Sequence, residues 1–347
     1  MSLSSPIEGR DHPGTRHASG ARPELRRALV VICGLVVAGW SAFIWALISG
    51  DVEVTPGDAL AAVLGRGDGL GADVVRHLRL PRAVAVFACG GLLAMAGALM
   101  QVLLRNPLAD PYVLGISGGA AVGALGAILL GATGVWADTA AFGGALAAML
   151  LVFGLAHGDG SWTQTRLLLT GVIVAAGCGA AITLMLSLAS DTRVQSMLFW
   201  LMGDASGARR PWPALFVMGV GLLVVLPFAR DLNVLTRGEA NARALGVRVE
   251  RLRYLLYLLA SLLTATAVTL IGSVGFVGLI VPHLVRFVIG NDQRLLLPAA
   301  MLAGGSLLLL ADTAARTLIA PVQLPVGVLT ALIGVPLFLF LLSRRPR

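Results

Sequence analysis

The sequence predicts an all-α polytopic membrane protein with about ten transmembrane helices. Of its 347 residues, 57% are hydrophobic and 13% are charged, whereas ordinary soluble domains carry about 25% charged residues. The mean hydropathy is +0.87, and a water-soluble core could not bury that much apolar surface. Apolar runs of roughly the 20 residues that a spanning helix needs recur along the chain.

The beginning of the chain differs from all that follows. Residues 1–27 are polar, contain five Arg and lack the apolar core of a signal peptide. We expect them to form a disordered cytoplasmic tail, followed by one transmembrane domain over residues 28–347. Within that domain the apolar runs predict ten spans, at residues 28–48, 83–104, 114–132, 137–156, 167–189, 212–229, 254–272, 276–290, 296–315 and 326–342.

A polar break separates the second and third spans. An apolar, Gly/Ala-rich helix runs to Arg105, residues 105–111 are polar or proline-rich, and a second small-residue helix starts near Gly115. Lipid offers no hydrogen bonds to exposed backbone, so such a break must face protein, water or the membrane edge. Small residues on the flanking helices allow close packing, which indicates a channel or carrier rather than a simple anchor.

Arginine placement predicts the orientation. All 26 basic residues of the chain are Arg, and cytoplasmic loops of membrane proteins are enriched in such residues. The tail, the loop 230–253 and the C-terminus are rich in Arg, and ten spans put all three on one side. That side is expected to be the cytoplasm, so both termini are cytoplasmic and the acidic loop 49–78 is outside.

Residues 191–203 are too short and too polar to span. Asp191 and Thr192 can cap a helix N-terminus, and Trp200 fits the headgroup region. We expect a short interfacial helix on the outer side.

Several function classes are excluded. The chain has no GxxxxGK[ST] phosphate-binding loop and no Lys to complete one. It has no HExxH and no metal-spaced cluster, and Cys33, Cys89 and Cys178 all lie in apolar runs, as small buried residues do. The net charge of +8 comes from Arg beside the spans, which indicates topology rather than nucleic-acid binding. We therefore expect no enzyme activity and no bound metal or cofactor.

Ionisable residues within the spans are scarce. Asp312 and Arg316 lie one helical turn apart and can pair with each other. A proton-driven carrier needs buried ionisable residues, so their scarcity indicates that energy comes from a separate protein.

The loop 230–253 predicts two short amphipathic helices on the cytoplasmic side. Thr236 and Glu239 have the spacing of a capping box, an Ala-rich stretch follows, and Gly246 can end the helix. This element is either a solvated connector or a docking element for a soluble motor.

Motifs along most of the chain resemble a known family. Residues 28–343 are similar to FecCD-type permease subunits of ABC importers for iron–siderophores, haem and vitamin B12. One departure is Gln323, where the family usually has Glu. The resemblance rests on the order of these motifs: Arg79–Arg82 (Arg-Leu-Pro-Arg), residues 106–111 (Asn-Pro-Leu-Ala-Asp-Pro), 114–120 (Leu-Gly-Ile-Ser-Gly-Gly-Ala), 166–171, 238–246, 275–283 (ending Val-Pro-His) and 324–328 (Leu-Pro-Val-Gly-Val).

The resemblance implies a complete importer in the bacterial inner membrane. Two copies of the chain would enclose one path on their two-fold axis. Two cytoplasmic ABC ATPase subunits would bind ATP and Mg, and a periplasmic binding protein would deliver the ligand. Haem or a ferric siderophore is expected rather than cobalamin, because iron systems are commoner in this family. The alternative is a stand-alone channel or secondary carrier for a small solute.

The resemblance also implies three sets of site residues. The ATPase-coupling set lies within a helix pair at 234–247, with Glu239 and Arg243 on its polar face. Gln164 and Thr165 would close a cytoplasmic gate. Arginines at the outer side would dock the binding protein, although headgroup anchoring is an open alternative for them. The full sets are Gly238, Glu239, Ala240, Arg243, Ala244, Leu245 and Gly246 for coupling, and Arg79, Arg82 and Arg316 for docking.

Overall fold

The computed structural model describes residues 21–156, 163–208, 210–320 and 322–343. Over these residues it contains helices and no strand, so the predicted all-α class is confirmed. Seven helices are long and apolar enough to cross a membrane, and three shorter apolar helices complete the ten predicted positions. These ten helices are α1 (Ala21–Ile48), α4 (Leu80–Leu103), α5 (Ile116–Leu129), α6 (Val135–Ala156), α7 (Gln164–Leu188), α9 (Trp212–Val225), α12 (Val249–Ile271), α13 (Val277–Ile289), α14 (Gln293–Thr317) and α15 (Val326–Ser343), of which α5, α13 and α15 are the shorter ones.

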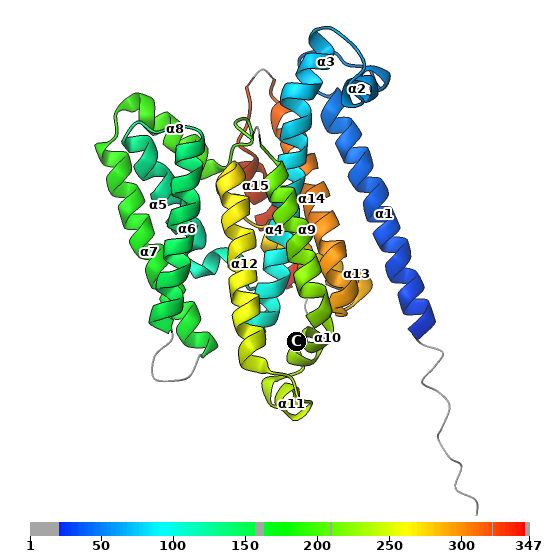
Figure 1. The fold of residues 1–347 in the computed structure, drawn as a ribbon, viewed down its shortest axis with the longest axis vertical. Coiled ribbons are helices and arrows are strands. Elements are labelled where there is room, and N and C mark those ends of the chain that lie inside the picture. The colour runs from blue at the N-terminus through cyan, green and yellow to red at the C-terminus, as the bar shows by residue number, and fades with distance from the viewer. Residues whose placement is uncertain (1–20, 157–162, 209, 321, 344–347) are drawn as a thin grey trace, which may run out of the picture.

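Short elements join the spans at the two ends of the molecule. One end carries α2, α3 and α8, and the other carries α10 and α11 (Figure 1). We call these the α3 end and the α11 end. The described ends of α1 and α15 both lie at the α11 end. The short elements are α2 (Pro56–Val63), α3 (Leu70–Val74), η1 (Val75–Arg79), η2 (Pro111–Leu114), α8 (Asp191–Met202), η3 (Leu226–Phe228), α10 (Ala229–Leu235) and α11 (Glu239–Ala244).

The first helix begins earlier than predicted. α1 starts at Ala21, so residues 21–27 continue the helix although the sequence analysis placed them in the tail. Residues 1–20 of that predicted tail lie outside the described residues. The chain therefore enters the helical domain about two turns earlier than its apolar run suggests.

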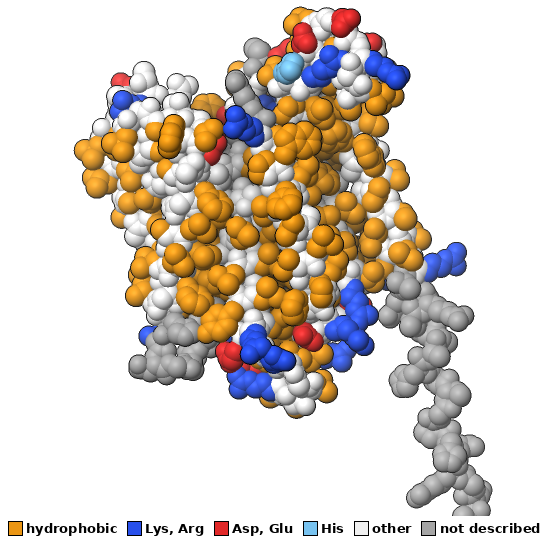
Figure 2. Space-filling view, viewed as in Figure 1, with side chains coloured by type: hydrophobic (Ala, Val, Ile, Leu, Met, Phe, Trp, Pro, Cys, Tyr) orange, Lys and Arg blue, Asp and Glu red, His pale blue; other side chains and the backbone are white. Residues whose placement is uncertain are grey.

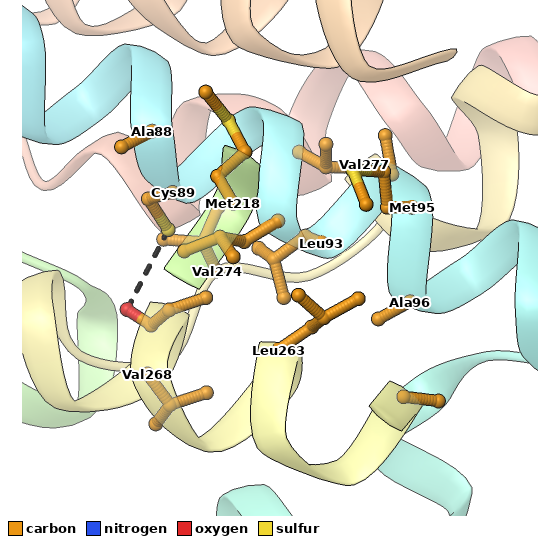
Figure 3. Packing of buried hydrophobic residues seen from close by; sticks show 14 of the residues in the cluster. Ala88, Cys89, Leu93, Met95, Ala96, Met218, Leu263, Val268, Val274 and Val277 are labelled. Atoms are coloured by element: carbon orange, nitrogen blue, oxygen red, sulfur yellow. Dashed lines mark hydrogen bonds between the residues drawn. The ribbon is translucent and has the colours of Figure 1, made fainter. Parts of the chain in front are cut away.

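α4 is the central helix of the fold. Nearly all of its residues are buried, and it packs against α9, α12, α13 and α14. Figure 3 shows Leu93 and Met95 of α4 beside Leu263 of α12 and Val277 of α13. A Cβ atom added at Gly97 would overlap the carbonyl group of Gly278 in α13. Small residues thus let the helix backbones touch, as in other packed membrane bundles.

A second group of helices, α5 to α8, packs beside this core (Figure 1). Gly119 of α5 and Gly144 of α6 lie so close that a Cβ on either would overlap the other's carbonyl. α7 packs on α5, α6 and η2. Hydrophobic side chains cover the band between the two ends of the molecule, and charged ones gather at the ends (Figure 2), as expected of a protein surrounded by lipid.

The polar break after α4 is satisfied by protein. The N–H groups of Arg105 and Asn106 return to the carbonyls of Val102 and Gln101 and close the end of α4. Asp110 then caps η2 by accepting from the Tyr112 N–H at 2.7 Å, and the Tyr112 hydroxyl is hydrogen-bonded to Val274 at 3.0 Å. The later part of the break, with Ala109 and Pro111, is therefore buried in the protein, whereas Arg105 and Asn106 at its start are exposed.

α8 is the short helix that residues 191–203 predict, and it lies at the α3 end. Its N-cap is Ser190, so the prediction that Asp191 or Thr192 caps it was wrong: both are already helical. The cap of a helix has non-helical dihedral angles, and in this chain Ser190 is the residue that adopts them.

Candidate functional site

The predicted coupling helix exists as α11, with a different start from the one predicted. Its N-cap is Gly238, whose φ of 121° is a conformation that glycine adopts readily. Thr236 instead ends α10, and its hydroxyl donates to the Asn233 carbonyl at 2.8 Å. The capping box predicted from Thr236 and Glu239 is therefore wrong.

The end of α11 follows the prediction. Gly246 has a φ of 82°, and its N–H donates to the carbonyl of Arg243. The Val247 N–H donates to the carbonyl of Ala242 at 3.0 Å. This pair of bonds is the Schellman motif that usually takes glycine at the left-handed position. Gly246 thus ends the helix and turns the chain toward α12.

Ion pairs fasten α11 to the start of α12. Glu239 binds Arg243 and Arg253, both at 2.7 Å, and Arg243 also binds Glu250 at 3.0 Å. Arg253 and Glu239 are mostly buried, with side chains 8% and 23% exposed. The charged groups of Glu239 and Arg243 are thus paired within the chain, although the Arg243 side chain is 59% exposed. Their place on a polar docking face stays a prediction.

Small and apolar residues are exposed on α11 beside the polar Asn241 and Arg243. Ala240, Ala244 and Gly246 are exposed, while Ala242 is buried beneath them. Leu245 is 71% exposed, although it lies at the end of the molecule where charged side chains predominate (Figure 2). Small residues beside one protruding leucine form a surface that another protein can approach closely.

The two predicted gate residues begin α7. Gln164 donates from Nε2 to the Leu103 carbonyl at 3.1 Å and accepts from Arg105 Nη2 at 3.3 Å. Its amide is therefore tied to the end of α4, whereas Thr165 is exposed. Thr163 caps the helix by accepting from the Arg166 N–H. The gate role of Gln164 and Thr165 stays a prediction, and residues 157–162 before them lie outside the described residues.

The three predicted docking arginines lie together at the α3 end, where Arg79 and Arg316 hold the end of α1. Arg79 is 6% exposed and donates to the carbonyls of Leu47, Ile48 and Val52 at 2.6 to 3.1 Å. Arg316 donates to the carbonyl of Ser49 at 2.8 Å and to that of Ala46. These bonds satisfy carbonyl groups that the end of a helix leaves without partners.

Arg82 forms the main ion pair of this cluster. It contacts both carboxylate oxygens of Asp312 at 2.8 to 3.2 Å, and its Nη1 donates to Gln323 Oε1 at 3.2 Å. Arg316 Nε lies 3.9 Å from Asp312. The pairing of Asp312 with Arg316 predicted from their spacing is therefore secondary to a pairing with α4.

The exposure expected of these arginines is not found. The side chains of Arg82 and Arg316 are 14% and 11% exposed, and their donors bind groups of the same chain. A role of Arg79, Arg82 and Arg316 in docking a partner stays a prediction. Their observed role is to join α1, α4 and α14.

The sequence analysis missed one polar cluster near the α11 end. Arg286 of α13 donates from Nη1 to Gln101 Oε1 at 2.9 Å, and Gln101 donates to the Leu279 carbonyl at 3.1 Å. An Arg within the apolar run 276–290 was the available signal. Among the described residues, no group of three His, Cys, Asp or Glu could hold a metal ion.

Comparisons with known proteins agree with this architecture. The model of the FecCD transport family matches residues 35–344. The chain is 46% identical over 277 residues to a cobalamin import system permease of Halobacterium salinarum, covering 78% of this chain and 74% of the relative. It is 37% identical over 332 residues to a vitamin B12 import system permease of Escherichia coli, covering 94% and 99%.

A solved structure extends the similarity to three dimensions. It is described as an inward-facing conformation of a metal-chelate type ABC transporter. The TM-score is 0.79 at 30% sequence identity, and the match covers 92% of this chain and 100% of the other.

Proposed function

Because the chain belongs to the FecCD transport family and is the membrane-spanning permease subunit of an ABC importer, we propose that it imports a metal chelate of the cobalamin class. The similarity to two permeases named for cobalamin or vitamin B12 import, one of them covered almost end to end, carries this proposal. The expectation of haem or a ferric siderophore rested on how common iron systems are. No residue described above favours iron chelates over cobalamin.

Two features of the chain support the proposed partners, namely the lack of a phosphate-binding loop in its sequence and the exposed small residues of α11. It has no phosphate-binding loop, so the two ABC ATPase subunits must bind and hydrolyse ATP. The small-residue face of α11 with the exposed Leu245 supports docking of such a subunit, because small side chains permit close backbone approach. A binding protein on the opposite side would deliver the chelate.

We place the α11 end in the cytoplasm of a bacterial cell and the α3 end in the periplasm. The Arg-rich loop 230–253 and both described chain ends support this orientation through the preference of basic residues for the cytoplasmic side. The acidic segment 49–78 lies at the opposite end. The protein would then reside in the inner membrane.

We also propose that two copies of the chain form the transport path. α7 and α15 are among the helices that expose the most apolar surface, including Ile173 and Leu332. A pocket of about 590 Å³ beside α15 is lined by small and apolar residues that include Gly275, Gly327 and Ala331. A second copy packed against these faces would enclose a path whose walls suit a large, weakly held ligand.

Transport in proteoliposomes tests the proposal. The chain would be reconstituted with its ATPase and binding protein, and uptake of labelled cyanocobalamin, haem and a ferric siderophore would be compared. We expect ATP-dependent uptake of cyanocobalamin. Uptake of haem alone would overturn the assigned chelate class and leave the importer assignment intact. Uptake by the chain without ATPase would favour the stand-alone carrier.

A further inference from the structure

A basic pocket lies beside the coupling helix at the α11 end. It has a volume of about 590 Å³ and opens between the end of α4, the segment after α10, the end of α13 and the start of α14. Three arginines from three separate segments line it, namely Arg105, Arg237 and Arg286, together with a single acidic residue, Asp292. Figure 2 shows basic side chains gathered at the α11 end of the molecule.

The positive charge of this pocket is not neutralised by the described part of the chain. None of the three arginines has a carboxylate oxygen within 4.0 Å among the residues that the structure describes. Asp292 Oδ1 accepts instead from Asn233 Nδ2 at 2.8 Å and from the Arg294 N–H at 3.1 Å. Arg105 and Arg237 are exposed, whereas Arg286 is partly buried. A partly buried charge without a counterion is costly, so an anion in the pocket would stabilise Arg286 most.

Arg286 is held in a defined position. The amide of Gln101, which is 4% exposed, accepts from Arg286 Nη1 at 2.9 Å and is itself anchored to the Leu279 carbonyl. A guanidinium group has five N–H donors, and within the described residues one donor group of Arg286 is used by this bond. The remaining donors are available to a ligand in the pocket.

Arg105 occupies a backbone position that glycine normally fills. It closes the end of α4 with a φ of 45°, in the left-handed region that costs free energy for a residue with a side chain. The side chain of Arg105 nevertheless lines the pocket, and its Nη2 donates to the predicted gate residue Gln164. The side chain of Arg105 is thus placed in the pocket at some cost in backbone strain.

Gln293 places a hydrogen-bond acceptor in the same pocket. It is 1% exposed and lines the pocket, and its Oε1 atom is buried without a hydrogen-bond partner among the described residues. A buried acceptor without a donor is unfavourable. A ligand hydroxyl would satisfy it.

We propose that this pocket binds a phosphate ester that carries a free hydroxyl, such as a glycerophosphate group. Arginine forks match the geometry of phosphate oxygens, and the volume lies in the range of about 300–1,000 Å³ typical of small-ligand sites. The ester can be a soluble metabolite or a phospholipid headgroup, since Phe287 and Val288 beside Arg286 expose apolar surface for acyl chains. The inference does not depend on which chelate is transported.

Thermal unfolding of the full-length protein in nanodiscs tests the proposal. In phosphatidylcholine nanodiscs, glycerol 3-phosphate is titrated against sodium chloride of matched ionic strength, and a ligand that binds the native state raises the unfolding temperature. Nanodiscs of phosphatidylglycerol alone test the lipid source. Stabilisation by glycerol 3-phosphate identifies a soluble ligand, and stabilisation only in phosphatidylglycerol identifies the headgroup.

Two exposed arginines provide the test variant. Arg105→Gln combined with Arg237→Gln should weaken the apparent affinity by about tenfold or more, whereas Arg230→Gln, an exposed arginine of α10 outside the pocket lining, should bind like the wild type. Absence of stabilisation by both ligands would overturn the proposal, as would equal stabilisation of the double variant. Loss of ATPase binding in the double variant without any phosphate effect would show that the pocket receives an acidic side chain, and would also overturn it.

Discussion

At the scale of single residues, Arg82 connects α4 to two distant parts of the chain. Its guanidinium group binds both oxygens of Asp312, which is 2% exposed, and it reaches Gln323 as well. Glutamine accepts this hydrogen bond without adding a second negative charge. The outer cluster of Arg79, Arg82 and Arg316 therefore keeps one carboxylate within 4.0 Å, among the residues that the structure describes.

Replacing Arg82 by Met should destabilise the protein strongly. The change leaves the carboxylate of Asp312 buried without its main partner, and breaking a buried ion pair in this way costs about 3–5 kcal/mol. Unfolding of the detergent-purified protein measures the loss, and Arg66→Gln, an exposed arginine at the same end, is the control. Adding Asp312→Leu should restore part of the stability. An unchanged unfolding midpoint in Arg82→Met would show that the pair is not structural.

Gly97 is the residue on which the contact of α4 with α13 depends. A methyl group there would overlap the Gly278 carbonyl, so Gly97→Ala should force the helices apart and cost roughly 1–3 kcal/mol or more. The matched control is Gly143→Ala in α6, where nothing lies within 4 Å of the added carbon. The prediction fails if the two variants unfold at the same temperature.

At the scale of elements, α11 shows what a local sequence pattern predicts and what it cannot. The Ala-rich stretch and Gly246 predicted a short helix and its end, since both signals act within one turn. The start was misplaced because Thr236 can serve either as a cap or as the last turn of α10. Gly238 determines where α11 begins. Its φ of 121° is not a helical conformation, so α10 and α11 cannot be continuous and α11 starts at Glu239.

A bulky residue on the exposed face of α11 should uncouple ATP hydrolysis from transport. Ala240 is exposed on α11, so Ala240→Trp should leave the permease folded while preventing close approach of the ATPase. ATP-driven uptake in proteoliposomes should be lost while ATPase activity persists. Ala240→Ser keeps the side chain small and should transport normally. Full transport by Ala240→Trp would mean that α11 is not the docking element.

At the scale of the whole molecule, the ten apolar helices were predictable from the apolar runs of the sequence, and seven of them are long enough to cross a membrane. The side-chain contacts that join these helices were not predictable from the sequence. Arg82 and Asp312 lie 230 positions apart in the chain, and they meet because α4 packs against α14. The spacing of residues within one helix predicted instead that Asp312 pairs with Arg316. Likewise, Glu239 pairs with Arg253 because α11 folds back onto α12. A local sequence pattern does not predict how two helices pack.

The proposed pairing of two copies of the chain can be tested directly at the start of α7. Thr165 is exposed beside Gln164, whose amide is tied to the end of α4. If two copies meet at a gate, cysteines at position 165 should approach each other. The background needs Cys33→Ser and Cys178→Ala, because these cysteines are exposed or partly exposed, whereas Cys89 is buried and can stay.

In that background, Thr165→Cys in the assembled complex should crosslink between subunits with a short reagent in at least one nucleotide state, because a gate must close at some point of the cycle. Leu60→Cys, exposed on α2 at the opposite end, should not crosslink. Gel mobility after each nucleotide condition measures the outcome. If position 165 stays uncrosslinked in every state while the complex still transports, the start of α7 does not lie at the two-fold axis.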